Sequence, residues 1–238
     1  MKPKKPTVVR NENFGYMVWN PGLDSYFLAN SEVEDSIGLV LQRKRLGETD
    51  ILRGLDDDLA RELKDLGFQD NLREIDNSLE DRLSAPLDVY YDYTFACNLK
   101  CTYCYNFDED RQVTMSNEYI ERVLTQLAGN GIMRTHLAGG EPLINYEGLK
   151  TYLQTATKGG MNASVNSNGT LLTDDLLQLM FDNDVKTLTF SLDGHTAGEH
   201  DQYRGSGNFA RARAKAKMAK HEKERNGSNI KLQYKAVH

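Results

Sequence analysis

The three cysteines of the chain, Cys97, Cys101 and Cys104, lie together in the stretch CNLKCTYCYN. A structural zinc site takes four ligands, usually two pairs of cysteine or histidine, and no second pair accompanies these thiols. A disulfide within the stretch would leave one thiol over. An iron–sulfur cluster fits better, because three thiolates leave the fourth iron of a cubane open to another ligand. The spacing therefore favours a cluster, with a three-thiolate zinc site as the alternative.

The composition sets the class of protein. The chain has 238 residues, of which 39% are hydrophobic and 27% are charged, so it can bury a substantial core. Its net charge of −6 argues against general binding of nucleic acid. No apolar run approaches the roughly 20 residues that cross a bilayer, and the start, MKPKKPTVVRNENFGY, lacks the apolar stretch of a secretory signal. We therefore expect a cytoplasmic protein with neither a membrane nor a nucleic acid as partner.

From residue 86 onwards the sequence alternates between strand and helix patterns. The expected strands cover residues 87–96, 134–140, 162–170, 185–194 and 230–238, and the expected helices cover residues 116–131, 146–160, 173–184 and 209–227. This alternation predicts an α/β fold with parallel strands and right-handed crossovers. In such folds chemistry gathers where the strands end, and the cysteine stretch and the loops GGEP, NSNGT and SLDG all fall there.

The region before Pro86 has a different texture. Short strands are expected at 15–21 and 25–30, followed by helices at 31–44 and 56–68, the first opened by a capping-box pattern. This order suggests a small α+β, winged-helix-like module, and a helical decoration on the main domain is the alternative. Because Pro86 disfavours helix before it, we expect a module of residues 1–85 and a core of residues 86–238.

The motifs in the core resemble those of the radical S-adenosylmethionine superfamily. The cysteines match its CX3CX2C signature, and Gly139-Gly140-Glu141-Pro142 matches its glycine-rich motif. Asn168-Gly169-Thr170 and SLDG at residues 191–194 are similar to later motifs. The stretch HDQYRG at residues 200–205 resembles the peptide-maturase branch, and the resemblance covers about residues 88–238. It implies a shortened, open TIM-type barrel of parallel strand–helix units.

The resemblance also implies a site. Cys97, Cys101 and Cys104 would hold a [4Fe–4S] cluster, and S-adenosylmethionine would bind its open iron and be cleaved to a 5′-deoxyadenosyl radical that takes hydrogen from the substrate. The expected contacts of S-adenosylmethionine are Tyr103 with the adenine, Gly139, Gly140, Glu141 and Pro142 around the methionine amine, Asn166 and Ser167 with the ribose, and Ser191 and Arg204 with the carboxylate. Glu141 has a second expected role, which is to orient its loop.

The maturase resemblance makes a ribosomally synthesised precursor peptide the expected substrate, captured by the N-terminal module through strand addition. No cysteine remains in this sequence for an auxiliary cluster, which favours redox-neutral chemistry such as excision within a peptide backbone. A flavodoxin-like protein or a chemical reductant would supply the electron. A small-molecule substrate and a non-catalytic metal-binding scaffold are the alternative interpretations.

The superfamily usually has six strand–helix units, and five strands are expected here. An open parallel edge invites association, so we expect an accessory protein subunit that docks near the last strand and completes the cavity.

Replacing one thiol tests the cluster. We expect Cys101→Ala to prevent the anaerobically reconstituted chain from holding a complete cluster and from cleaving S-adenosylmethionine, because alanine cannot ligate iron. Iron analysis and chromatography of the cleavage products measure both effects. Lys100→Ala is the control, since this neighbour offers iron no thiolate. Full iron content and cleavage in Cys101→Ala would contradict the assignment.

Overall fold

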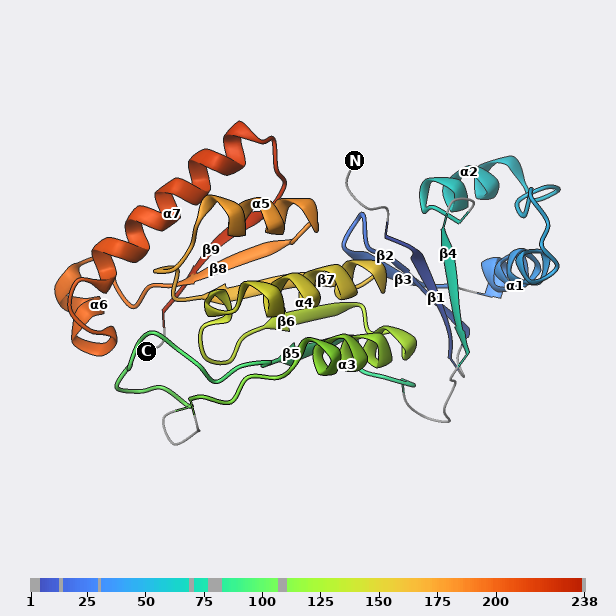
Figure 1. Ribbon diagram of the computed structural model, residues 1–238. Coiled ribbons are helices and arrows are strands. Elements are labelled where there is room, and N and C mark those ends of the chain that lie inside the picture. The colour runs from blue at the N-terminus through green and yellow to red at the C-terminus, as the bar shows by residue number, and fades with distance from the viewer. Residues whose placement is uncertain are drawn as a thin grey trace.

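The computed structural model describes residues 5–12, 15–29, 31–68, 71–76, 83–106 and 111–236. The strands in this part of the chain form two sheets, one of four strands before Pro86 and one of five strands after it. Figure 1 shows the two sheets toward opposite ends of the molecule. Expectations that fall on Asn30, on the side chain of Ser31 and on His238 lie outside what is described.

The second sheet carries the candidate site. Its strands are β5 (Asp88–Tyr91), β6 (Arg134–Leu137), β7 (Asn162–Ser167), β8 (Thr187–Ser191) and β9 (Lys231–Lys235), all parallel and in chain order. The expected α/β fold with an open, partial TIM-type barrel is confirmed. Because every strand runs in the same direction, the loops that follow the strands meet at one edge of the sheet.

Helices cross between these strands and cover the sheet. They are α3 (Asn117–Gly129), the short 3₁₀ helix η1 (Pro142–Ile144), α4 (Tyr146–Lys158), α5 (Asp174–Asp182), α6 (Ala197–Arg204) and α7 (Asn208–Arg225). Contacts run from α3 to α4, from α4 to α5 and from α5 to α7, and Figure 1 shows these helices along one side of the sheet. Sequence reasoning predicted all of the α-helices except α6.

Polar caps and apolar faces explain where the helices form. The side chain of Ser116 accepts a hydrogen bond from a backbone N–H in the first turn of α3, and Asn145 and Thr173 do the same for α4 and α5. The buried faces of these helices share one hydrophobic core with the strands, in which Leu124 and Leu153 are fully buried. The core therefore fixes the crossovers and leaves the carboxyl ends of the strands to loops.

The first sheet has the order β3-β2-β1-β4. Its elements are β1 (Thr7–Glu12), β2 (Gly15–Asn20), β3 (Ser25–Leu28), α1 (Ser31–Arg45), α2 (Asp57–Asp65) and β4 (Leu72–Asp76). β1 pairs antiparallel with β2 and parallel with β4. The two predicted strands and both helices are present. β1 and β4 were not predicted, because the charged residues at 10, 12, 73, 74 and 76 obscure the strand pattern. The division into two domains stays a prediction.

A buried ion pair joins the first sheet to the segment that leads into the second. The Nη2 of Arg10 lies 2.5 Å from Oε1 of Glu12, and both side chains are completely buried. Arg10 also donates to the carbonyls of Ala85 and Gly131, and Glu12 accepts from the backbone N–H of Ser84. Since Gly131 ends the turn between α3 and β6, this pair ties both parts of the chain together.

A second set of contacts lies on the neighbouring strand. The indole of Trp19 donates to the carbonyl of Gly160 at 3.2 Å, and the guanidinium of Arg134 lies 4.9 Å from the centre of its ring. Lys5 donates to the side chain of Asn162 at 2.7 Å.

No helix in the described ranges has both the length and the apolar character that a membrane crossing requires.

The buried pair gives a stability prediction. We expect Glu12→Gln to lower the free energy of unfolding by about 3–5 kcal/mol, because the charge of Arg10 would stay buried without its partner. Urea denaturation measures the loss. Glu224→Gln is the control: it breaks an exposed pair with Lys220 whose charged atoms lie 4.0 Å apart, and it should change stability by less than ~1 kcal/mol. Equal midpoints for the two variants would show that the buried pair contributes little.

Candidate functional site

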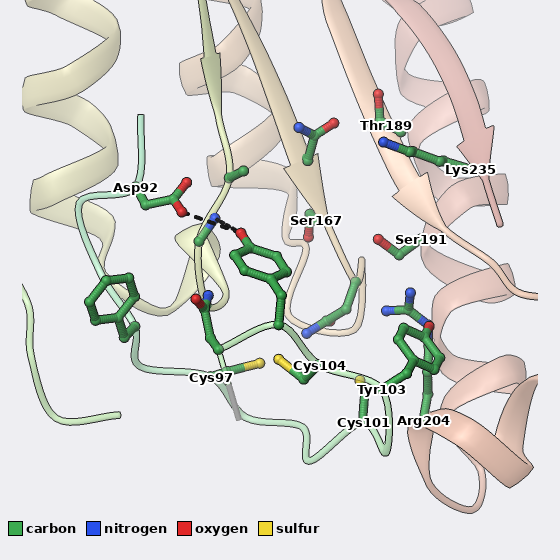
Figure 2. Close-up of a pocket in the computed structure, with 18 of the residues that line it drawn as sticks. Asp92, Cys97, Cys101, Tyr103, Cys104, Ser167, Thr189, Ser191, Arg204 and Lys235 are labelled. Carbon is green, nitrogen blue, oxygen red and sulfur yellow. Dashed lines mark hydrogen bonds between the residues drawn. The ribbon is translucent and has the colours of Figure 1, made fainter. Parts of the chain in front are cut away.

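A cavity of about 600 Å³ opens at the carboxyl ends of β5 to β9. Its wall includes all three cysteines together with residues from every one of these strands or from the loop that follows it. Figure 2 shows the cysteines at one end of this cavity, with the strand ends of β7, β8 and β9 beside them. The topology thus gathers segments that are more than 130 residues apart in the sequence.

The cysteine loop follows β5 and is held by backbone contacts. The N–H of Thr102 donates to the carbonyl of Tyr203 at 3.0 Å, and Arg111 donates to the carbonyl of Leu99 at 2.5 Å. All three thiols are free, with Cys101 buried and the other two half-buried. Burial raises the pKa of the thiols of Cys97 and Cys101, so both thiols are neutral at pH 7.

The glycine turn at residues 139–140 lies directly against the chain that leads into the cysteine loop. A Cβ added to Gly140 would lie 2.2 Å from the carbonyl oxygen of Ala96, and one added to Gly139 would lie 2.6 Å from that of Thr94. Gly139 also has a φ of +99°, which disfavours any side chain. Sequence reasoning explained these glycines by the approach of a ligand. The structure gives a second reason, which is the approach of the backbone at residues 94–96.

Glu141 is completely buried behind the cavity wall. Its carboxylate accepts hydrogen bonds from the N–H of Leu143 at 3.0 Å, from the hydroxyl of Ser167 at 2.8 Å and from the N–H of Asn168 at 2.8 Å. Burial raises the pKa of Glu141, and these hydrogen bonds oppose the shift. The carboxylate of Glu141 thus joins the loops after β6 and β7, and its expected contact with the methionine amine stays a prediction.

Pro142 also lies behind the wall rather than on it. It is buried at the start of η1, and its carbonyl accepts the hydroxyl of Tyr93 at 2.6 Å. Pro142 thus supports the glycine turn from behind, and its expected contact with S-adenosylmethionine stays a prediction.

The ends of β7, β8 and β9 supply polar side chains to the cavity. Asn166, Ser167 and Ser191, which were expected to contact S-adenosylmethionine, line it. Thr189 and Lys235 also line it and were missed. The strand register places Thr189 beside Asn166 and Lys235 beside Ser191. Because side chains two apart in a strand share a face, Ser191 could have pointed to Thr189.

Asp92 lines the opposite side of the cavity and was also missed. Its carboxylate accepts the hydroxyl of Tyr105 at 3.3 Å, and that hydroxyl accepts the N–H of Gly139 at 3.3 Å (Figure 2). Burial raises the pKa of Asp92. This side of the cavity is therefore built from the end of β5 and the residue after the third cysteine.

Arg204, at the end of α6, is buried and lines the cavity. Its Nε donates to Oδ2 of Asp193 at 2.5 Å, and its Nη2 lies 3.3 Å from Oδ1 of the same residue. The guanidinium lies 5.5 Å from the ring centre of Tyr103. Burial lowers the pKa of Arg204, but Asp193 raises it by more, so the residue stays charged. The sequence suggested Arg204 from its motif but gave no sign that Asp193 holds it.

The core of the chain is similar to proteins of one known superfamily. The family model described as the Radical SAM superfamily matches residues 91–230. The mycofactocin maturase MftC of Mycobacterium ulcerans is 27% identical over 134 residues, which are 56% of this chain and 36% of that protein. The subtilosin biosynthesis protein AlbA of Bacillus subtilis is 29% identical over 148 residues, 61% of this chain and 33% of that protein. The matches thus cover about a third of these relatives.

A solved structure shows the same fold. The crystal structure of SuiB from Streptococcus suis bound to S-adenosylmethionine has a TM-score of 0.68 at 17% identity. The superposition covers 100% of this chain and 57% of SuiB, so it includes the N-terminal sheet as well as the partial barrel.

The glycine turn gives the prediction for this site. We expect Gly140→Ala to lower the free energy of unfolding by about 1–3 kcal/mol and to reduce iron uptake, because the new Cβ must push residues 94–96 and the cysteine loop away. Thermal unfolding and iron analysis check this. The control is Gly129→Ala, where a Cβ would meet no atom within 4 Å. It should leave stability unchanged or raise it slightly, and matching losses in the two variants would refute the explanation.

Proposed function

Because the chain belongs to the radical SAM superfamily, we propose that it is an enzyme that binds a [4Fe–4S] cluster through Cys97, Cys101 and Cys104 and binds S-adenosylmethionine beside it. The bound pair supplies one-electron cleavage of S-adenosylmethionine, which starts hydrogen abstraction from the substrate. The observation that carries the proposal is that the three thiols line one cavity with the polar strand ends.

The donor set fits a cluster better than a single ion. Each thiolate of a cluster binds a different iron, so the thiols must surround the cluster rather than meet at one point. Among the described residues, no three histidine, cysteine or acidic side chains are gathered to hold one metal ion. A tetrahedral zinc ion would need such a gathering. The arrangement therefore supports the cluster over the zinc-loaded scaffold.

The residues around the thiols suit the parts of S-adenosylmethionine. Two N–H groups of Arg204 are directed at Asp193, and a guanidinium has five, so others remain for the carboxylate together with the hydroxyl of Ser191. The backbone carbonyls of Gly139 and Gly140 are suitable acceptors for the ammonium group. Asn166 and Ser167 would hold the ribose hydroxyls, and the ring of Tyr103 would pack near the adenine.

We further propose that the substrate is a precursor peptide. MftC is named as a mycofactocin maturase and AlbA as a subtilosin biosynthesis protein, and SuiB has been crystallised bound to the precursor peptide SuiA. β3 is an edge strand of the N-terminal sheet, and its Tyr26 and Leu28 are 44% and 54% exposed. An extended peptide that paired with this edge would gain main-chain hydrogen bonds and bury both side chains.

The remaining partners are also proposals. A flavodoxin-like protein or a chemical reductant would deliver the electron, and an accessory subunit would dock at β9. β9 is one of the two edge strands of the five-stranded sheet in the described residues, and its Tyr234 is 60% exposed. Excision within the peptide backbone stays a prediction that product mass would decide.

Anaerobic reconstitution tests the proposed function. The chain should take up iron and turn brown, and with reductant and S-adenosylmethionine it should form 5′-deoxyadenosine. Adding a short peptide encoded beside its gene should raise that rate and change the mass of the peptide. A colourless chain that binds zinc alone would overturn the enzyme proposal. Cleavage that no such peptide affects would instead favour a small-molecule substrate.

Two substitutions test the cofactor contacts. We expect Ser191→Ala and Arg204→Ala to weaken S-adenosylmethionine binding roughly tenfold to a hundredfold, since each removes a hydrogen bond to a charged group. Iron content should stay at the wild-type value, because neither residue binds iron. Calorimetric titration measures the affinity. Thr187→Ala is the control, because Thr187 lies at the other end of β8 from Ser191 and outside the cavity wall. Wild-type affinity in both test variants would remove them from the site.

A further inference from the structure

Asp193 is a buried carboxylate that joins the cysteine loop to α6. It is 0% exposed and lies just after β8 in the stretch SLDG. Its Oδ2 accepts both the Nε of Arg204, at 2.5 Å, and the hydroxyl of Tyr103. Figure 2 shows Tyr103 and Arg204 side by side at the same corner of the cavity. One carboxylate oxygen thus holds two residues of the cavity wall, Tyr103 from the cysteine loop and Arg204 from the end of α6.

The position of Asp193 is fixed by its own surroundings. Its backbone N–H donates to Nδ1 of His200 at 3.2 Å, which requires a neutral ring. His200 is buried, and its ring centre lies 5.7 Å from that of Phe209. Burial lowers the pKa of His200, consistent with the neutral form. The backbone of Asp193 is therefore held by His200 of α6, which in turn packs against Phe209 at the start of α7.

The same corner has a second link between the cysteine loop and α6. The N–H of Thr102 donates to the carbonyl of Tyr203, the residue before Arg204. Thr102 and Tyr103 stand between the second and third cysteines. A side-chain link and a backbone link therefore hold this part of the loop in one position relative to α6.

A buried ion pair gives little net stability, because desolvation of the two charges offsets their attraction. The contribution of this pair is geometric. Asp193 fixes the plane of the guanidinium because it binds both Nε and Nη2. The remaining N–H groups of Arg204 then point in one direction. The same carboxylate accepts the hydroxyl of Tyr103 and so holds the cysteine loop, which forms the neighbouring part of the cavity wall.

We propose that Asp193 is a positioning residue that sets the cysteine loop and Arg204 in the arrangement that S-adenosylmethionine requires, before the cofactor binds. The part concerning S-adenosylmethionine rests on the proposed function. The part concerning the loop does not, because it concerns the chain alone.

Asp193→Asn is the test variant, since it keeps the size of the side chain and removes its charge. We expect the reconstituted variant to keep its iron, because the thiols are intact, and to bind S-adenosylmethionine at least tenfold more weakly. The EPR spectrum of its reduced cluster should change only at a correspondingly higher concentration of S-adenosylmethionine. Glu12→Gln is the matched control, because it breaks another completely buried ion pair, far along the chain from the cavity. Affinity that falls equally in both variants, or in neither, would overturn the proposal.

Hydrogen–deuterium exchange before reconstitution tests the loop without any cofactor. Backbone exchange over residues 97–106 should rise in Asp193→Asn and stay at the wild-type rate in Glu12→Gln. A wild-type chain that takes up no iron would defeat the proposed function, while this measurement would still decide the role of Asp193 in the loop. Unchanged exchange over these residues would overturn that role.

Tyr103→Phe keeps the test decisive if Asp193→Asn loses stability throughout. It removes one hydroxyl and leaves the ion pair in place, and it should raise exchange over residues 97–106 by a smaller amount. If the hydroxyl acts through Asp193, Tyr103→Phe should weaken S-adenosylmethionine binding in the wild-type chain but add little in Asp193→Asn. If the double variant lost affinity for S-adenosylmethionine by the product of the two single losses, the two residues would act independently, and this would contradict the proposal.

Discussion

The backbone at the glycine turn lies so close to residues 94–96 that no side chain fits between them. The N–H groups of Gly140 and Glu141 donate to the carbonyls of Thr94 and Ala96, each at 2.8 Å. The cysteine loop begins at the very next residue, Cys97, so its position is set by this contact. The cavity wall on the β6 side and the thiols are thus built as one unit.

Two buried carboxylates extend this unit to the rest of the strand ends. Glu141 receives its hydrogen bonds from neutral donors and connects the loops after β6 and β7. Asp193 receives its bonds from a guanidinium and a phenol and connects the loop after β8 to the cysteine loop and α6. Both carboxylates are fully buried, where each must find donors in the protein rather than in water. Their common effect is to add side-chain links between the loops that form the cavity wall.

The N-terminal sheet stands apart from this unit but is joined to it through the core. Arg10 and Glu12 reach the turn before β6 and the segment before β5, and Trp19 reaches the end of α4. These contacts lie at the amino ends of the barrel strands, away from the cysteines. The exposed edge strand β3 on the N-terminal sheet and the cavity at the second sheet fit the proposed capture of a peptide at one place and its modification at another.

The sequence by itself determined the α/β class, most helices of the core and the cysteine site, because these depend on local spacing and on the alternation of strand and helix. It also suggested Ser191 and Arg204, which stand in motifs, and Asn166, a polar residue at the end of a strand. β1, β4 and α6 were missed, since charged residues mask the strand pattern and α6 is short. Sequence reasoning also missed Thr189, Lys235 and Asp92. They line the cavity because the parallel strands end at the same edge of the sheet. The tertiary structure alone decided that Glu141 faces the loop after β7 and that Asp193 holds Tyr103 and Arg204. Those contacts join residues 11 to 90 positions apart, and no local pattern encodes which buried donors a carboxylate will meet.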